Sequence, residues 1–297
     1  MTEENIIPEA PQITAEQLEQ CRKSGDFSPV LFEWYKFVGR LCIFYASFRA
    51  DSPAVRPMPE LNYGVLVGLL TRCARLMFSN VVLSHEGLFG ETTAILDRCI
   101  FDSSVKISWL CTQANKKNFD RFIADGLKSE LVFKNKINEI ISERGGHVLE
   151  IEKRMLTSIE NYVATSKLTE IQIESARKLP DLATMIKDIN HDRLLYIVGQ
   201  KLGSHHVHGT WPSLWLHYLE EHDGHLGPRD HNCQTHVNQY VFVPLIVLES
   251  IRDFVKFVFP DPEEAKPLSQ LLEAVGDEIH KINAEVVGND FEQVKEI

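Results

Sequence analysis

The chain has 297 residues, of which 44% are hydrophobic and 25% charged, and its formal net charge at neutral pH is −11. This balance is typical of a globular protein that buries its core in one large helical domain or two small ones. The acidic excess disfavours loose, sequence-independent binding of nucleic acid, because such binding depends on Lys and Arg that neutralise phosphates.

The cellular setting is predicted from the cysteines and from the apolar runs. The six cysteines are scattered and form no CxxC pair, which favours a reducing cytoplasm over a disulfide framework. The first residues have neither the basic nor the apolar segment of a signal peptide. No uninterrupted apolar run approaches the roughly 20 residues that span a bilayer. We therefore expect a cytoplasmic protein that does not enter a membrane.

Helical periodicity runs along almost the whole chain. Residues 1–13 are expected to form a flexible arm, and residues 14–290 a single helical domain. A capping box is predicted at Thr14 with Gln17, and Ser28 followed by Pro29 marks a second helix start. Later helices are predicted at about 61–83, 88–114, 116–143, 147–166, 170–178, 181–188, 191–207, 212–221, 234–258 and 262–287. No alternating run indicates a strand, so the predicted fold is an all-α multi-helix bundle.

The predicted helix at 88–114 is apolar around nearly its whole circumference, which is typical of a helix at the centre of a bundle. Even so, Glu91, Arg98 and Asp102 fall within about 40° of one line along it, at 100° per residue. Charges in such a place must be paired or hydrogen-bonded. The pattern therefore indicates either a buried ion pair that fixes the helix register or a polar pocket inside the bundle.

The predicted helix at 191–207 carries glycines four residues apart, at Gly199 and Gly203. Glycine weakens a helix, so its benefit here would be the close approach of a neighbouring helix. A polar stripe runs beside these glycines. We expect this stripe to face the charged line of the 88–114 helix and to enclose one internal cleft, formed by Arg98, Asp102, Tyr196, Ser204 and His208.

Two stretches carry a family resemblance: LDRCIFDSSVKISWL (residues 96–110) and LLYIVGQKLGSHHVHGTW (residues 194–211). Together they resemble a bacterial helical family of unknown function that is distantly similar to the HEPN superfamily. The resemblance covers about 60–255 and implies a HEPN-like core with extra N- and C-terminal helices. It also implies a metal-independent ribonuclease or toxin-type effector, without a cofactor, in toxin–antitoxin or phage-defence systems. RNA would be the substrate, an antitoxin or neighbouring defence protein a partner, and the assembly a homodimer.

The resemblance assigns roles to single residues. His208 would be the acid or base, since imidazole titrates near neutrality, and Arg98 would stabilise charge on the phosphate. Asp102 would orient Arg98. Substrate contacts would come from Tyr196, Ser204 and Lys201, the last of which stands where HEPN ribonucleases carry Arg.

Other interpretations of the same residues stay open. His208 precedes Gly209 and could be a histidine at a helix C-terminus, placed favourably against the helix dipole. The bundle could be a non-catalytic module that binds a protein partner or small ligand.

Eight of the twelve histidines lie between His205 and His236. A metal-dependent hydrolase is therefore a third hypothesis, with ligands among His222, His225 and His231. The helical spacing of three aromatic residues predicts core packing rather than a base-stacking platform: Trp211, Trp215 and Tyr218.

Overall fold

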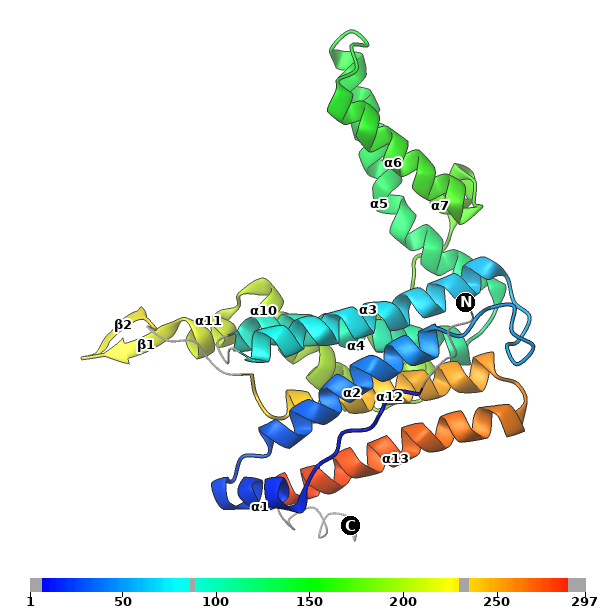
Figure 1. The fold of residues 1–297 in the computed structure, drawn as a ribbon. Helices are drawn as coiled ribbons and strands as arrows, with labels where there is room; N and C mark the ends of the chain where they lie inside the picture. The colour runs from blue at the N-terminus through cyan, green and yellow to red at the C-terminus, as the bar shows by residue number, and fades with distance from the viewer. Residues whose placement is uncertain (1–6, 86–88, 230–234, 288–297) are drawn as a thin grey trace. The chain divides into compact units, whose positions relative to one another are not determined.

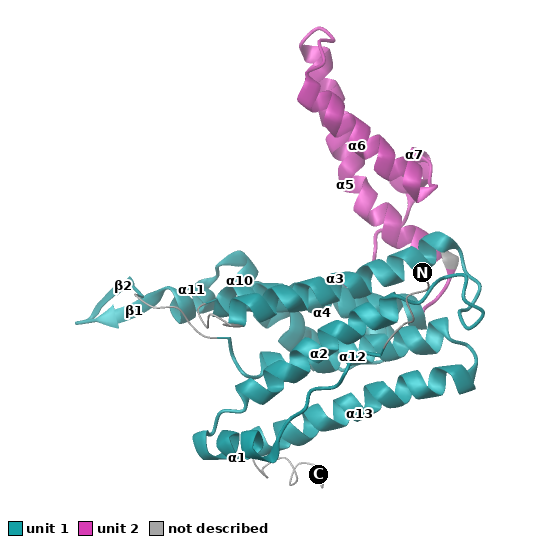
Figure 2. Cartoon of the chain, viewed as in Figure 1, with its two compact units in different colours: residues 1–112, 182–297 teal, residues 113–181 magenta. Residues whose placement is uncertain are grey.

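The computed structural model describes residues 7–85, 89–229 and 235–287. Contacts divide the chain into two compact units (Figure 2). Unit 1 comprises residues 1–112 and 182–297, and unit 2 comprises residues 113–181. A compact unit is not by itself a domain that folds alone, so the single domain expected over 14–290 stays a prediction.

Unit 1 is built from helices of very different lengths (Figure 1). Its long helices are α2 (Ser28–Ala46), α3 (Glu60–His85), α4 (Gly90–Thr112), α12 (Gln239–Val258) and α13 (Pro262–Val287). Its short elements are α1 (Ala15–Ser24), α8 (Leu182–Asp188), α9 (Arg193–Tyr196), the π-helix η1 (Ile197–Leu202), α10 (Gly203–His208) and α11 (Trp211–His217). A two-stranded sheet, β1 (Leu219–His222) with β2 (His225–Pro228), completes the described part. The all-α prediction is thus confirmed.

The core of unit 1 lies among α2, α3, α4 and α12, and α13 packs on α12. Fully buried side chains such as Phe37, Leu70, Phe101 and Phe254 fill it. The predicted capping box at the start of α1 is present. The Thr14 hydroxyl accepts from the Gln17 backbone N–H at 3.2 Å, and the Thr14 backbone N–H donates to the Gln17 side chain. Strong apolar periodicity therefore placed the long helices well.

Helix α3 corrects one expectation. Residues 60–84 are long and apolar enough to cross a membrane by length and composition, with a mean hydropathy of 1.5. The helix packs against both α2 and α4, and Leu66, Leu70 and Cys73 are fully buried there. One helix of this kind is weak evidence for a membrane span, because a core helix can have the same length and composition, and α3 contributes side chains to the core of unit 1.

Unit 2 contains α5 (Lys116–Glu143), α6 (Glu150–Ser166) and α7 (Glu170–Ser175). As predicted, α5 ends before a glycine pair, Gly145 and Gly146, whose φ angles are +77° and +84°. After this turn the Glu152 carboxylate accepts hydrogen bonds from the Arg144 guanidinium at 2.6 and 3.0 Å, which lowers the pKa of Glu152 to about 2. The small core of unit 2 contains Ala124, Leu127, Leu131 and Ile173.

Two predictions about residues 191–233 are wrong. The expected helix at 191–207 is divided into α9, η1 and α10, with a π-helix in its middle. The helix predicted at 212–221 ends at His217 and is followed by β1, and the stretch after it contains a tight turn and β2; in the turn, Asp223 and Gly224 have φ angles of +50° and +79°. Positive φ at both central residues is what a two-residue hairpin requires, and Asp-Gly is a common sequence for it. The strands were missed because four-residue strands carry almost no alternation.

Candidate functional site

Helix α4 lies very close to η1 and α10 at the two glycines. A Cβ atom on Gly199 would lie 2.3 Å from the Phe101 ring, and one on Gly203 would lie 3.2 Å from the Arg98 side chain. Gly199 therefore needs to be glycine for the close approach, and a side chain at Gly203 would fit only if Arg98 moved by a few tenths of an ångström. The predicted close approach of a neighbouring helix is confirmed, and that neighbour is α4.

The π-helix decides which side chains face α4. A π-turn holds one more residue than an α-turn, so the residues that follow it are rotated away from where a continuous α-helix would put them. As a result, His206 lies toward α4, whereas His208 is exposed in the last turn of α10. A pattern analysis at 100° per residue cannot locate such an insertion.

A cavity of about 200 Å³ opens between α4, η1, α10 and the start of α12. Much of its wall is apolar, including Phe101 and Phe242. Its polar lining comes from Asp97, Arg98, His206, Asn238 and Gln239. An apolar pocket with a few convergent polar groups is the usual form of a small-molecule or active site.

Polar atoms without partners gather at this cavity. Among the described residues, Asp97 Oδ2, Arg98 Nε and His206 Nδ1 are buried and have no hydrogen-bond partner. Buried polar atoms are nearly always hydrogen-bonded, and each exception needs a reason. Three such atoms around one cavity are hydrogen-bonding groups that a polar ligand would satisfy.

Arg98 is held from one side by Asp102, one helical turn further along α4. The two side chains form an ion pair and are 14% and 25% exposed. Arg98 lines the cavity and Asp102 does not. Both interpretations of the charged line therefore apply. Arg98 and Asp102 form a partly buried ion pair, and Arg98 also lines a pocket.

Asp97 precedes Arg98 and was missed by the sequence analysis. Its Oδ1 atom accepts hydrogen bonds from the Asn80 amide at 2.5 Å and from the Tyr35 hydroxyl at 3.4 Å. Burial raises the pKa of Asp97 well above its usual value, and these two hydrogen bonds only partly oppose the effect. Asp97 is thus a carboxyl group that tends to keep its proton, with its second oxygen unpartnered.

His206 stands edge-on to His217 of α11, with 5.1 Å between the ring centroids. Burial lowers the pKa of both imidazoles; the neighbouring imidazole lowers that of His206 further, and the Glu91 carboxylate acts in the opposite direction on both. Glu91 in turn accepts hydrogen bonds from the Ser213 and Tyr218 hydroxyls. A neutral histidine pair thus adjoins the cavity.

The remaining residues of the expected cleft do not line the cavity. The Ser204 hydroxyl donates to the Gln200 carbonyl at 2.7 Å, within its own helical turn. The Lys201 ammonium lies 6.0 Å from the centroid of the Tyr196 ring. The expected single cleft is therefore wrong in its geometry for Tyr196, Ser204 and His208, although their roles toward a substrate stay predictions.

Residues 63–226 match the model of a family of unknown function, DUF5677. The chain belongs to the DUF5677 family. No curated protein and no solved structure matches it. The expected membership of a helical family of unknown function is thereby confirmed. The DUF5677 segment contains Asp97, Arg98 and His206, whereas α12 lies beyond it.

The histidines suggested as metal ligands lie elsewhere in the DUF5677 protein. His222 and His225 pair across the hairpin turn, and His222 contacts the Glu220 carboxylate at 2.9 Å. His231 falls outside the described residues. Within residues 7–85, 89–229 and 235–287, no three His, Cys, Asp or Glu side chains are grouped as a metal would need.

The aromatic residues after α10 were predicted to pack in the core, and this is wrong. Trp211, Trp215 and Tyr218 are 59%, 43% and 51% exposed. The two indole rings stack on each other, with 5.9 Å between centroids and 30° between planes. Large apolar side chains at Leu194 and Leu226 are also more than half exposed. These exposed apolar side chains all lie on the short elements between α9 and β2.

Proposed function

We propose that this protein is a HEPN-like, metal-independent ribonuclease whose reacting site is the cavity between α4, η1, α10 and α12. The observation that supports it is the convergence of Asp97, Arg98 and His206, each with an unpartnered buried polar atom, on one cavity. The proposal keeps Arg98 from the sequence analysis, replaces His208 by His206 and adds Asp97. A toxin-type or phage-defence role in the cytoplasm, with an antitoxin partner and a homodimer, is part of the same proposal.

The chemistry needs a base, a cation and an acid. His206 takes the proton of a ribose 2′-hydroxyl, and the 2′-oxygen attacks the adjacent phosphorus. The Arg98 guanidinium matches the phosphate oxygens and stabilises the negative charge that grows on them. The 5′-oxygen leaves and takes a proton from Asp97. The products are a 2′,3′-cyclic phosphate and a 5′-hydroxyl, so no metal-bound water is required.

The electrostatic environment favours these proton positions at neutral pH. The lowered pKa of His206 leaves the imidazole neutral and able to accept a proton. The raised pKa of Asp97 favours the protonated carboxyl group, which is the form that can donate a proton. Two groups whose pKa values are pushed apart in one pocket are a common acid–base arrangement. Asp102 offsets part of the charge of Arg98, so the site fits a phosphodiester rather than a highly charged ligand.

The test is RNA cleavage by the purified protein in the presence of a chelator. His206→Ala and Arg98→Ala should each lower the rate by about 100-fold or more, since general acid–base and electrostatic contributions are of that size. His208→Ala is the matched control, two residues away and exposed, and should stay within about twofold. Growth arrest on expression should follow the same pattern. Absence of cleavage, or equal loss in His206→Ala and His208→Ala, would reject the assignment.

A partner-binding module is the second candidate, and the exposed apolar surface around Trp211 and Trp215 favours it. Aromatic side chains dominate the energetics of many protein interfaces. This reading predicts a stoichiometric complex with a neighbouring gene product and no toxicity on expression. Trp211→Ala with Trp215→Ala should abolish that complex, while His206→Ala should leave it intact.

A further inference from the structure

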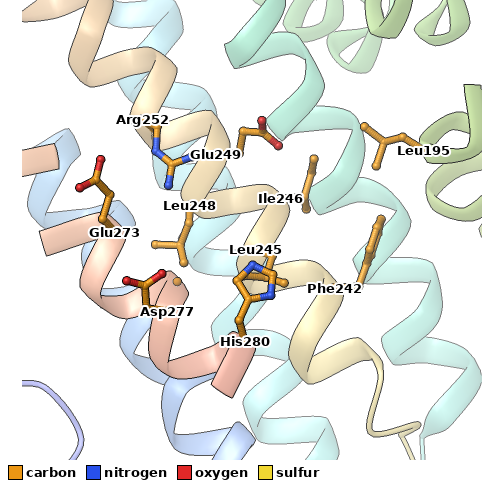
Figure 3. Close-up of a pocket in the computed structure, with 11 residues that line it drawn as sticks. Leu195, Phe242, Leu245, Ile246, Leu248, Glu249, Arg252, Glu273, Asp277 and His280 are labelled. Carbon is orange, nitrogen blue, oxygen red and sulfur yellow. The ribbon is translucent and has the colours of Figure 1, made fainter. Parts of the chain in front are cut away.

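A second cavity, of about 390 Å³, lies between α12 and α13 in unit 1, with Leu195 of α9 also in its lining. Figure 3 shows its side chains. Its volume is in the range of small-molecule sites, roughly 300–1,000 Å³. None of the residues used in the proposed cleavage chemistry lines it.

The cavity has one cation without a partner. Among the described residues, Arg252 forms no ion pair, and its Nε atom is buried without a hydrogen bond. In Figure 3 its guanidinium lies between the side chains of Glu249 and Glu273. Glu249 is itself 3.2 Å from the His191 ring. Arg252 is thus available to an acceptor oxygen that enters the cavity.

The opposite charge comes from α13. Glu273 and Asp277 line the cavity one helical turn apart, and neither forms an ion pair in the described part of the chain. The cavity therefore holds more negative than positive charge. This charge favours an occupant with a cationic group, and the same occupant can offer Arg252 an oxygen.

Much of the rest of the wall is apolar, although Glu249 and His280 also line the cavity, and a glycine leaves free volume in it. Phe242, Leu245 and Leu248 of α12 line one side. Gly276 lies in a buried part of α13, yet a Cβ atom built there would meet nothing within 4 Å. Glycine inside a helix costs about 1 kcal/mol relative to alanine. Here it leaves free volume against an apolar wall.

We propose that this cavity binds an α-ammonium group that carries an apolar side chain and a neighbouring carbonyl or carboxylate oxygen. The ammonium lies against Asp277 and Glu273, the oxygen accepts from Arg252, and the side chain packs on Leu245 and Leu248. A free apolar amino acid and the N-terminal residue of a peptide both have this chemistry. Because the cavity is net negative, the ammonium is required and the carboxylate is not.

The experiment is calorimetric titration of the full chain with L-leucine, L-leucinamide, the peptide Leu-Gly-Gly and N-acetyl-L-leucine. Leucinamide should bind, and N-acetyl-L-leucine should bind at least tenfold more weakly because it lacks the ammonium. Tighter binding of leucine than of the peptide identifies a free amino acid as the natural source, and the reverse identifies a peptide N-terminus. No binding of the four compounds at millimolar concentration overturns the proposal, as does N-acetyl-L-leucine binding as tightly as leucinamide.

Variants assign the binding to this cavity. Asp277→Asn should weaken leucinamide binding about tenfold, and Gly276→Leu should abolish it by filling the free space. Glu264→Gln on α13 and Lys256→Met on α12 are matched controls, because both side chains are exposed and outside the cavity. The exposed position of Asp277 keeps its variant folded, which a melting curve confirms. Unchanged binding in Asp277→Asn would overturn the proposal.

Discussion

Helix α4 has two kinds of neighbour, and they differ in regularity. Toward α3 and α12 it meets long helices whose contacts are fully buried, as at Met77 and Val247. Toward residues 193–217 it meets a chain of elements four to seven residues long, one of them a π-helix. That second region exposes Leu194 and Trp211 to solvent. Stability is therefore concentrated on one side of α4, and the irregular side contributes His206 and the glycines of the candidate site.

The largest expected difference between the two sides is in stability. Met77→Ala, on the α3 side of α4, should lower the free energy of unfolding by about 2–5 kcal/mol, because the side chain is fully buried and its loss leaves a cavity. Trp211→Ala should change it by no more than about 0.5 kcal/mol, since the indole is 59% exposed. Denaturant titration measures both. A large cost for Trp211→Ala would mean that the irregular region carries as much of the stability as the core.

The contact between the two regions gives the next prediction. Gly199→Ala should destabilise the protein by about 1–3 kcal/mol, because its Cβ would overlap the Phe101 ring. Gly64→Ala is the matched control, also inside a helix but with nothing within 4 Å of the new Cβ. It should stabilise by roughly 0.4–1 kcal/mol. If both variants behave alike, α4 and η1 are not held in close contact.

The same contrast explains how much could be predicted from the sequence. The long helices were located to within a few residues at most ends, because their apolar periodicity is strong and because Ser28 followed by Pro29 marks the start of α2. The glycine approach and the Arg98–Asp102 pair were also predicted. The other residues that line the cavity were not predicted. For His206 the reason is that the π-helix shifts the helical register after Tyr196. Asp97 was missed because its hydrogen bonds come from other helices, at Tyr35 and Asn80.

The pH dependence of stability should have opposite signs on the two sides of α4. Asp97 lines the cavity but takes its hydrogen bonds from α2 and α3, and burial raises its pKa in the folded protein, whereas an unfolded Asp ionises at about pH 3.9. The contribution of Asp97 to the free energy of unfolding is fully present below the pKa of the unfolded chain and is lost as the pH rises through the folded pKa. Asp97→Asn removes this term. The stability difference between wild type and variant should therefore shift against the wild type from pH 4 to pH 8, in denaturant titrations; parallel profiles would contradict it.

On the irregular side, the pKa values of His206 and His217 are both lowered by burial. Their contribution to the free energy of unfolding is present above the pKa of about 6.5 that histidine has in the unfolded chain. It is lost as the pH falls through the pKa values of the folded protein. Acidification from pH 7 to pH 5 should therefore open α10 and α11 while α2 keeps its protection. Amide hydrogen exchange, corrected for its intrinsic pH dependence, should become faster at 203–217 and stay unchanged in α2. His206→Gln should weaken that response and His208→Gln should not. An equal response in both variants would mean that the pH sensitivity arises outside the cavity. The two sides of α4 would then differ only in the regularity of their helices.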